Sequence, residues 1–388
     1  MKKIITSIAM CIVIVFTFTN TVFANGDEEV KESVDSYINE QLNKLSLDDI
    51  QNHIMEEELI VDVDIKTFIK DLISGEKTML DLFDKEGMKL FLFQELKSSL
   101  KVASIILVLA LLSSILKSLD NSFSSGAISQ VTTYIVFIVM VTLTLIGFKD
   151  VLNICNDTID SMINLMQIVM PILITFLVVM GFPMTSTVMT PIFMGGVTFI
   201  NVIFKNFLFV TITIGFSILV INNISNSIKL KKLSSFIKQM NLITIGAIFT
   251  IYLGLVSMQG MYVKSLDGFA VKSTKFAIGN FIPVVGGFVS DSFDIILSSS
   301  QLIKNLFGGV GLIILVGICL IPIIKIVSII LVYKTSAMVV EPVGEENISN
   351  FLNEIANLMA IMLACIIAIT IMFFVTIAIV ISISVVSQ

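Results

Sequence analysis

Two aspartates in the last third of the chain have a spacing that could support chemistry. Asp291 and Asp294 lie three residues apart, so a helix would place both on one face, with several serines nearby. Such a face could carry cations or protons along a pathway through a membrane. A short amphipathic segment at the membrane surface, with its acids in water, would show the same pattern. The sequence leaves both interpretations open.

Helix-breaking and charged residues surround this pair in a stretch, residues 276–333, that is otherwise apolar. Such residues are costly at membrane depth unless the backbone is buried in protein or lines a wet cavity. Lys325 follows Pro322 near the middle of an apolar run, so it either snorkels to an interface or pairs with an acid. We therefore predict that one set of residues lines a channel or forms a docking surface: Pro283, Gly286, Gly287, Asp291, Asp294, Lys304 and Lys325.

Catalytic chemistry is poorly supported by the remaining residue types. The sequence has 4 cysteines without a CxxC pair and 1 histidine, so a structural zinc site, a histidine triad and a thiol redox motif all lack parts. A pair of aspartates without metal ligands or a placed nucleophile does not define a reaction. We predict no catalytic residue, no metal site and no cofactor, and therefore a protein that is not an enzyme.

The composition is that of a membrane protein. Hydrophobic residues make up 56% of the 388 positions and charged residues 14%, and several apolar runs reach the roughly 18 to 20 residues that span a bilayer. The expected fold is an all-α polytopic membrane protein in contact with lipids. All 24 basic residues are lysine, so arginine clamps on phosphate are absent and nothing indicates nucleic-acid binding.

The N-terminus has the features of an export signal. Lys2 and Lys3 precede an apolar core, and small residues lead up to a cleavage site after Ala24. We predict a signal peptide over residues 1–24, with an uncleaved anchor helix as the alternative. Either reading places the following residues outside the cytoplasm.

Residues 25–100 form an acidic extracytoplasmic region. It carries 19 acidic residues against 8 lysines, and its apolar residues recur at helical spacing. Short amphipathic helices need partners. The region is either a small helical cap packed on its own transmembrane domain or a docking surface for another extracytoplasmic protein.

Residues 101–388 form the transmembrane domain, with about eight or nine membrane segments, some broken by glycine and proline. The predicted segments are residues 102–119, 128–148, 162–180, 188–204, 207–221, 242–258, 276–297, 306–333 and 355–385. The fourth and fifth are short and share a hinge at Lys205 and Asn206.

One loop fixes the orientation of the first half. Residues 222–241 carry Lys229, Lys231, Lys232 and Lys238 and no acid, which predicts a cytoplasmic basic loop by the positive-inside rule. Beyond Met258 the topology is open. If residues 276–297 are re-entrant, the C-terminus ends outside; if they cross the membrane, it ends inside.

Two segments share a pattern that could indicate an inverted repeat. Pro191 and Pro283 are each followed by a Gly-Gly pair, an apolar or amphipathic stretch and Lys-Asn before a long apolar helix. Inverted repeats with discontinuous helices are common in secondary transporters. Chance similarity between two interrupted apolar segments is the alternative.

The segment KFAIGNFIPVVGGFVSDSFDIILSSSQLIKNLFGGVGLIILVGICLIPIIKI resembles the most distinctive part of the stage III sporulation protein AE family of endospore-forming bacteria. The resemblance extends to the signal peptide, the acidic helical region, the number of segments and the length. It implies a protein of the mother-cell membrane around the engulfed forespore, without known catalytic residues.

The resemblance also implies partners. The family is encoded with seven companions whose products, with a forespore membrane partner, form a transenvelope channel or feeding tube. The acidic region would face ring-forming companions, and the lysine-rich loop would face the mother-cell cytoplasm. The alternative function is a stand-alone secondary transporter or permease for a small solute or ion, which broken helices and the Asp291/Asp294 face would suit.

Overall fold

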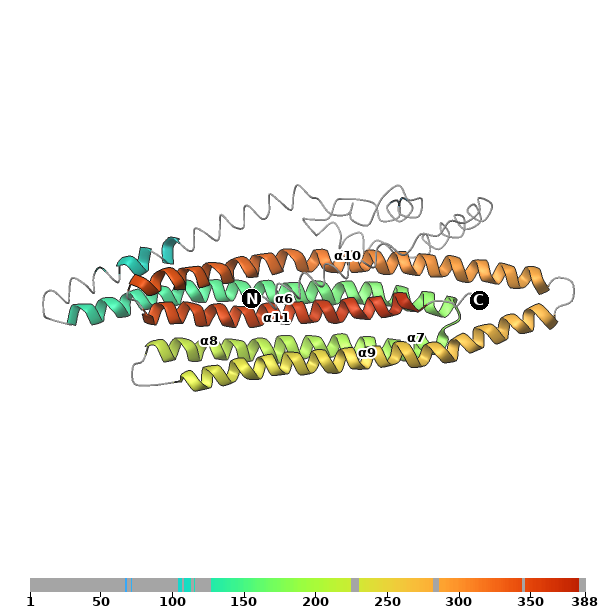
Figure 1. Cartoon of the computed structure of the whole chain (residues 1–388), viewed down its shortest axis with the longest axis horizontal. Helices are drawn as coiled ribbons and strands as arrows, with labels where there is room; N and C mark the ends of the chain where they lie inside the picture. Colours follow the sequence, from blue (N-terminus) through green and yellow to red (C-terminus); the bar gives the residue numbers. More distant parts are fainter. Residues whose placement is uncertain are drawn as a thin grey trace.

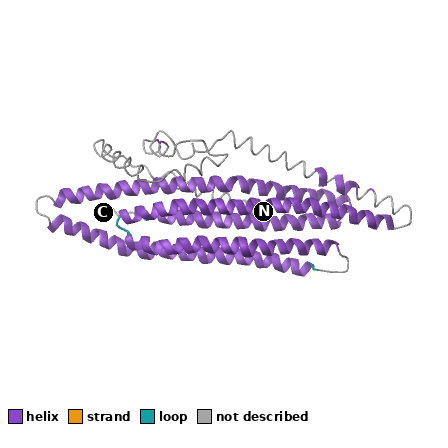
Figure 2. Cartoon of the chain, turned by 180° about the vertical axis from the view of Figure 1, so that it is seen from behind, coloured by secondary structure: helices purple, strands orange, loops and turns teal. Residues whose placement is uncertain are grey.

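Helices joined by short turns make up the part of the chain that its computed structural model describes, and this part contains no strand, which confirms the predicted all-α class (Figure 2). The described residues are 127–224, 230–281, 286–343 and 346–383, with residues 67, 71, 104–106, 108–112 and 115 before them. The predicted signal peptide lies outside the described residues. So does the acidic region 25–100 apart from residues 67 and 71, and both predictions stay predictions.

Within the described residues, five long helical rods run antiparallel to their neighbours in sequence (Figure 1). Their elements are α6 (Ala127–Val179), α7 (Pro183–Asn201), the π-helix η2 (Val202–Leu208), α8 (Phe209–Ile224), α9 (Lys231–Phe281), α10 (Gly286–Val340), the 3₁₀ turn η3 (Glu341–Val343) and α11 (Glu346–Ser382). Because α7, η2 and α8 follow one another without a break, they form a single rod.

All five rods are long and apolar enough to cross a membrane. The protein is therefore a multi-pass membrane protein by the length and composition of its helices. α6 has 53 residues and α10 has 55, which at a rise of about 1.5 Å per residue makes each roughly 80 Å long. A bilayer with its headgroups is only about 40 to 45 Å thick. Both helices must therefore project beyond the membrane.

The predicted number of eight or nine segments is not confirmed, because predicted segments merge into single helices. Residues 128–148 and 162–180 both lie in α6, and residues 188–204 and 207–221 both lie in the α7–η2–α8 rod. The reversal predicted at Lys205 and Asn206 is wrong, since η2 carries the helix through that point. In α6 no proline or glycine stands between residues 148 and 162, so polar residues alone do not end the helix.

A glycine ends α6 and reverses the chain. Gly181 has a φ of 82°, the left-handed conformation that glycine adopts without strain. The amide of Phe182 donates to the carbonyl of Leu177 over 2.8 Å, and the amide of Gly181 donates to the carbonyl of Val178 over 3.0 Å. These two bonds form a Schellman motif. Pro183 then begins α7 at a position where its missing amide hydrogen is not needed.

The core of the bundle lies around α10 and α11. Every residue of α10 from 303 to 330, and of α11 from 354 to 381, is buried or half-buried, whereas α6, the α7–η2–α8 rod and α9 have exposed faces. α10 and α11 approach closely at Gly308, where an added Cβ would lie 2.3 Å from Cγ1 of Ile381. A cluster of Met162, Cys319 and Thr370 joins α6, α10 and α11.

The inverted repeat is wrong in this fold. Its first copy lies inside α7 and η2, and its second copy lies at the turn between α9 and α10. The chain reverses twice between them, so α7 and α10 run in the same direction through the bundle (Figure 1). An inverted repeat requires opposite directions.

Candidate functional site

The segment that the sequence singled out, residues 276–333, divides into two parts: its first part lies around the tip of the α9–α10 hairpin, and the part with Lys304 and Lys325 lies in α10 within the bundle. Gly286 and Gly287 are the first residues of α10, and Pro283 lies outside the described residues. Asp291 and Asp294 belong to the first turns of α10, but their side chains are not among those described. The α9–α10 hairpin extends past the ends of α6 and α11, at the end of the bundle opposite the α8–α9 loop (Figure 1).

Lys304 has a structural role in the bundle. Its side chain is fully buried, and its Nζ donates to the carbonyl oxygens of Val380 at 3.2 Å and Ile381 at 3.1 Å and also to that of Ile383. The last carbonyls of a helix have no partner within the helix and carry partial negative charge. Lys304 therefore satisfies the C-terminal end of α11 and attaches α10 to it. In this position its ammonium group does not face an open passage.

The other predicted lysines separate into different environments. Lys325 is half-buried on α10. Lys231 and Lys232 are exposed in the first turn of α9, and Lys229 lies outside the described residues. Lys238 forms an ion pair with Glu354 of α11, so this lysine joins two helices as well as belonging to the basic segment.

A polar face on α6 is the most unusual surface of the described bundle. From residue 149 to residue 177 no exposed position of α6 carries a large hydrophobic side chain. The exposed residues there are Lys149, Asp150, Asn153, Asp157, Asp160, Asn164, Gln167, Pro171 and Thr175. We call this set the polar face. Its spacing of three and four residues keeps it on one side of the helix.

The flanking parts of α6 are apolar on the outside. Ile138 is 60% exposed and Ile146 55% before the polar face, and Val178 is 49% exposed after it. The α7–η2–α8 rod also exposes large apolar side chains, among them Phe199, Val202, Val210 and Ile214. The polar face is thus a local feature of α6 and not a property of the whole outer surface.

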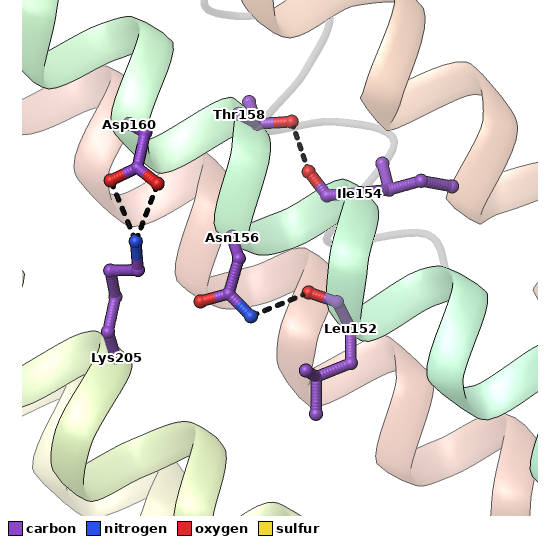
Figure 3. Close-up of polar contacts among 6 residues, drawn as sticks. All are labelled: Leu152, Ile154, Asn156, Thr158, Asp160 and Lys205. Carbon is purple, nitrogen blue, oxygen red and sulfur yellow. Dashed lines mark hydrogen bonds and ion pairs between the residues drawn. The ribbon is translucent and has the colours of Figure 1, made fainter.

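One ion pair joins the polar face to the neighbouring rod. Lys205 of η2 lies 2.7 Å from both carboxylate oxygens of Asp160 (Figure 3). The side chain of Asp160 is 52% exposed and that of Lys205 is 22% exposed. π-helical turns are uncommon and occur often at functional sites, because they shift the side chains that follow. Here the π-helix carries the lysine that meets Asp160.

Two further polar side chains of this region bond to their own helix. Asn156 donates to the carbonyl oxygen of Leu152 over 3.0 Å, and Thr158 donates to that of Ile154 over 2.6 Å (Figure 3). Neither side chain needs a partner from outside α6. The side chains that project outward at this level are therefore those of the polar face.

This face is not predicted from the sequence, because the predicted segments 128–148 and 162–180 leave residues 149–161 between them. The signal was nevertheless present. The polar residues Asn153, Asp157, Asp160 and Asn164 recur at helical spacing in a stretch without a helix breaker.

The described residues do not suggest a metal centre. Within them, no group of three or more His, Cys, Asp and Glu side chains is placed to hold a metal ion. Cys155, Cys319 and Cys365 are buried thiols, which suits packing in an apolar core.

Comparison with known proteins identifies relatives of the chain. Residues 63–384 match the family model described as Stage III sporulation protein AE. The Stage III sporulation protein AE of Bacillus subtilis (strain 168) is 25% identical over 317 residues, which cover 82% of this chain and 79% of that protein. No solved structure matches.

Proposed function

Because the chain belongs to the stage III sporulation protein AE family, we propose that it acts as a non-enzymatic membrane component of the channel complex between mother cell and forespore. The family supports a role in sporulation, and the five apolar rods place that role in a membrane. The mother-cell membrane around the forespore is the proposed location. The partners are the other stage III sporulation proteins of the same operon and a forespore membrane protein.

One observation carries this proposal beyond the family name: the helices are far longer than a bilayer. α9 has 51 residues and α10 has 55, so their hairpin reaches tens of ångströms beyond a hydrocarbon core of about 30 Å. A small-solute transporter needs little structure outside the membrane. Rigid helices that project from it offer surfaces on which soluble domains of companion proteins could assemble.

The direction of the rods gives a proposed topology. If the lysine-rich α8–α9 loop is cytoplasmic, then the α6–α7 turn, the α9–α10 hairpin and the end of α11 lie at the opposite, extracytoplasmic end (Figure 1). Each merger of two predicted segments into one rod removes one crossing, so three crossings instead of five precede the loop and the side of the loop is unchanged. In this topology the C-terminus is outside, and the signal peptide and acidic region 25–100 precede the first crossing.

Cysteine labelling tests the topology. In a variant without the four native cysteines, Ser235→Cys at the start of α9 and Ser273→Cys near its end would each provide one exposed position. The variants are expressed in vegetative cells, where the extracytoplasmic side of the cell membrane faces the medium. A membrane-impermeant thiol reagent added to these intact cells should label Ser273→Cys only, and Ser235→Cys only after permeabilisation. Labelling of both positions from the same side would overturn the topology.

Photo-crosslinking tests the assembly. A photoreactive residue at Ser273 in the projecting hairpin should crosslink, in sporulating cells, to products of the neighbouring sporulation genes. The matched control is Ile243, which is 62% exposed in the apolar part of the same helix and should meet lipid. If the chain purifies without companions and alone accumulates a specific solute in liposomes against its gradient, with saturation, the stand-alone transporter replaces this proposal.

A further inference from the structure

We infer that the polar face of α6 lines a water-filled passage that favours cations and is enclosed by several copies of this chain. The inference deepens the proposed function, on which it rests, by naming the surface that would conduct. It follows from the length, depth, chemistry and charge of the polar face.

The polar face is long enough to cross the apolar layer of a membrane. From Lys149 to Thr175 it rises by about 1.5 Å per residue, which gives roughly 40 Å, against a hydrocarbon thickness of about 30 Å. A polar surface of this length cannot lie only in the headgroup region. If α6 spans the bilayer here, the face passes from one side to the other.

Contacts with the next rod fix the depth of the polar face. Phe148 stacks on Phe216 with ring centroids 4.4 Å apart, and Asp160 meets Lys205 at 2.7 Å. This antiparallel register brings Val210 and Val202 to nearly the same depth as Asn153 and Asn164. Val202 is 49% exposed and Val210 is 51% exposed. At the same depth, therefore, the α7–η2–α8 rod exposes valines, which suit lipid, and α6 exposes asparagines, which suit water.

Lipid is a poor environment for the polar face. An aspartate or lysine at the centre of a membrane helix costs about 2.5 to 3.5 kcal/mol on insertion scales. Lys149, Asp150, Asp157 and Asp160 all lie on the exposed side of α6. Snorkelling relieves residues near one end of a span, but it does not relieve Asp157 and Asp160 together with Asn164 along the whole face.

A dry contact with another membrane helix also fits poorly. Helices that pack against each other in lipid use small residues, which let the two backbones approach. The exposed side chains from Asn153 to Gln167 are instead carboxylates and amides. These groups can each form several hydrogen bonds and are satisfied by water. A wet passage therefore fits the residue types better than a packed interface.

The charges of the face favour cations. Lys205 offsets Asp160 through the ion pair. Lys149 and Asp150, at the end of the face, contribute one charge of each sign to its total. Asp157 remains, and no cation among the described residues pairs with it. Repetition of Asp157 around a closed assembly would give a ring of carboxylates, the arrangement that selects cations in known pores.

Copies of the same chain are the simplest way to enclose the passage. The polar face occupies one side of one helix, so a single chain supplies only part of a wall. At the same depth the neighbouring rod exposes mainly large apolar side chains, among them Phe199, Val202 and Val210, with Thr198, Asn201, Asn206 and Thr213 between them. Membrane oligomers close around a symmetry axis. A ring of copies would place every polar face toward the axis and every apolar surface toward lipid.

Thiol labelling at matched depths tests the passage. In the variant without native cysteines, reconstituted in lipid nanodiscs, Asn153→Cys and Asn164→Cys are compared with Val210→Cys and Val202→Cys. Charged methanethiosulfonate reagents should modify the two α6 positions and leave the two control positions unmodified. The cationic reagent should react faster than the anionic one, and Asp157→Asn should reduce that difference. Native mass spectrometry of the same sample should show more than two copies.

Each other outcome overturns the inference. If Asn153→Cys and Asn164→Cys stay unmodified while Ser235→Cys reacts, the face is dry. If they react and the particle contains only one or two copies, the passage is not enclosed by a ring of copies. If the anionic reagent reacts faster, the cation preference is wrong. None of these results depends on companion proteins, so failure here is distinguishable from failure of the proposed sporulation complex.

Discussion

Lys304 of α10 donates a hydrogen bond of 3.2 Å to the carbonyl oxygen of Val380 in the last turn of α11. The bond joins the base of the projecting α9–α10 hairpin to the end of the most buried helix. Because Lys304 is fully buried, its ammonium group depends on these carbonyl oxygens for the interactions that water would otherwise supply. This contact therefore fixes the position of the hairpin relative to the membrane bundle.

Replacement of Lys304 by methionine should lower the stability of the bundle. Lys304→Met keeps the unbranched apolar part of the side chain but leaves carbonyl oxygens of α11 without a donor, a loss of about 1 to 3 kcal/mol. Thermal unfolding in detergent should show a lower Tm than the wild type. Lys232→Met, at an exposed position in the first turn of α9, is the control and should leave Tm unchanged. Equal Tm values for both variants would show that Lys304 does not stabilise the helix end.

Gly308→Ala should weaken the contact between α10 and α11. The added Cβ would lie 2.3 Å from Cγ1 of Ile381, so one helix must shift, and overpacking of this kind costs about 1 to 3 kcal/mol. The second substitution Ile381→Ala removes the clash and should restore part of the loss. Gly254→Ala is the matched control, because nothing lies within 4 Å of its Cβ position. Alanine there should stabilise α9 by up to about 1 kcal/mol.

These values can be read from thermal or denaturant unfolding of the purified variants. If Gly308→Ala is tolerated as well as Gly254→Ala, then α10 and α11 are not in contact at this point. That result would question the antiparallel packing of the two central helices.

The ion pair between Asp160 and Lys205 should tolerate exchange of its charges. Asp160→Lys places two cations side by side and should destabilise the contact between α6 and η2. The double variant Asp160→Lys/Lys205→Asp should recover most of the loss. Since Asp160 is 52% exposed, the effect of the single change should stay within about 1 kcal/mol if water surrounds the pair.

A double-mutant comparison of Tm in nanodiscs measures this recovery. No recovery in the double variant would show that the two residues do not meet. If the single change Asp160→Lys lowers the stability by much more than about 1 kcal/mol, the pair lies in lipid and not in water.

The sequence predicts the structural class of the protein, but it does not predict where each helix begins and ends. Apolar runs of membrane length predicted an all-helical membrane protein, because no other structure satisfies the backbone in lipid. The family followed from one long segment, residues 275–326, and the family match over residues 63–384 confirmed it.

Helix boundaries could not be predicted from hydropathy alone. The polar residues from Lys149 to Asp160 interrupt the apolar run and were interpreted as a loop, yet α6 continues through them. A window of hydropathy averages over all sides of a helix and does not detect a polar stripe on one side. Lys205 and Asn206 likewise predict a reversal of the chain, but both residues lie in the π-helix η2 and the chain does not turn there.

The roles of individual lysines depended on packing that no local pattern reveals. Lys304 was expected near a channel or docking surface, and its partners are carbonyl oxygens of residues 380–383, which are remote in sequence. Lys238 was expected in a basic loop and meets Glu354 across two helices. Contacts between distant segments can be found only once the helices are placed side by side.

The central claim is that the polar face of α6 is required, inside the membrane, for the sporulation function of this family member. The most direct measurement is the count of heat-resistant spores from strains that express Asn164→Leu/Gln167→Leu in place of the wild type. The control strain expresses Val202→Leu/Val210→Leu, two changes on the apolar surface at similar depth. Both proteins must be present in the membrane in equal amounts.

We expect the α6 variant to sporulate no better than a strain without the gene, because leucine would interrupt the wet surface. We expect the control strain to match the wild type. Normal spore counts from the α6 variant would contradict the account.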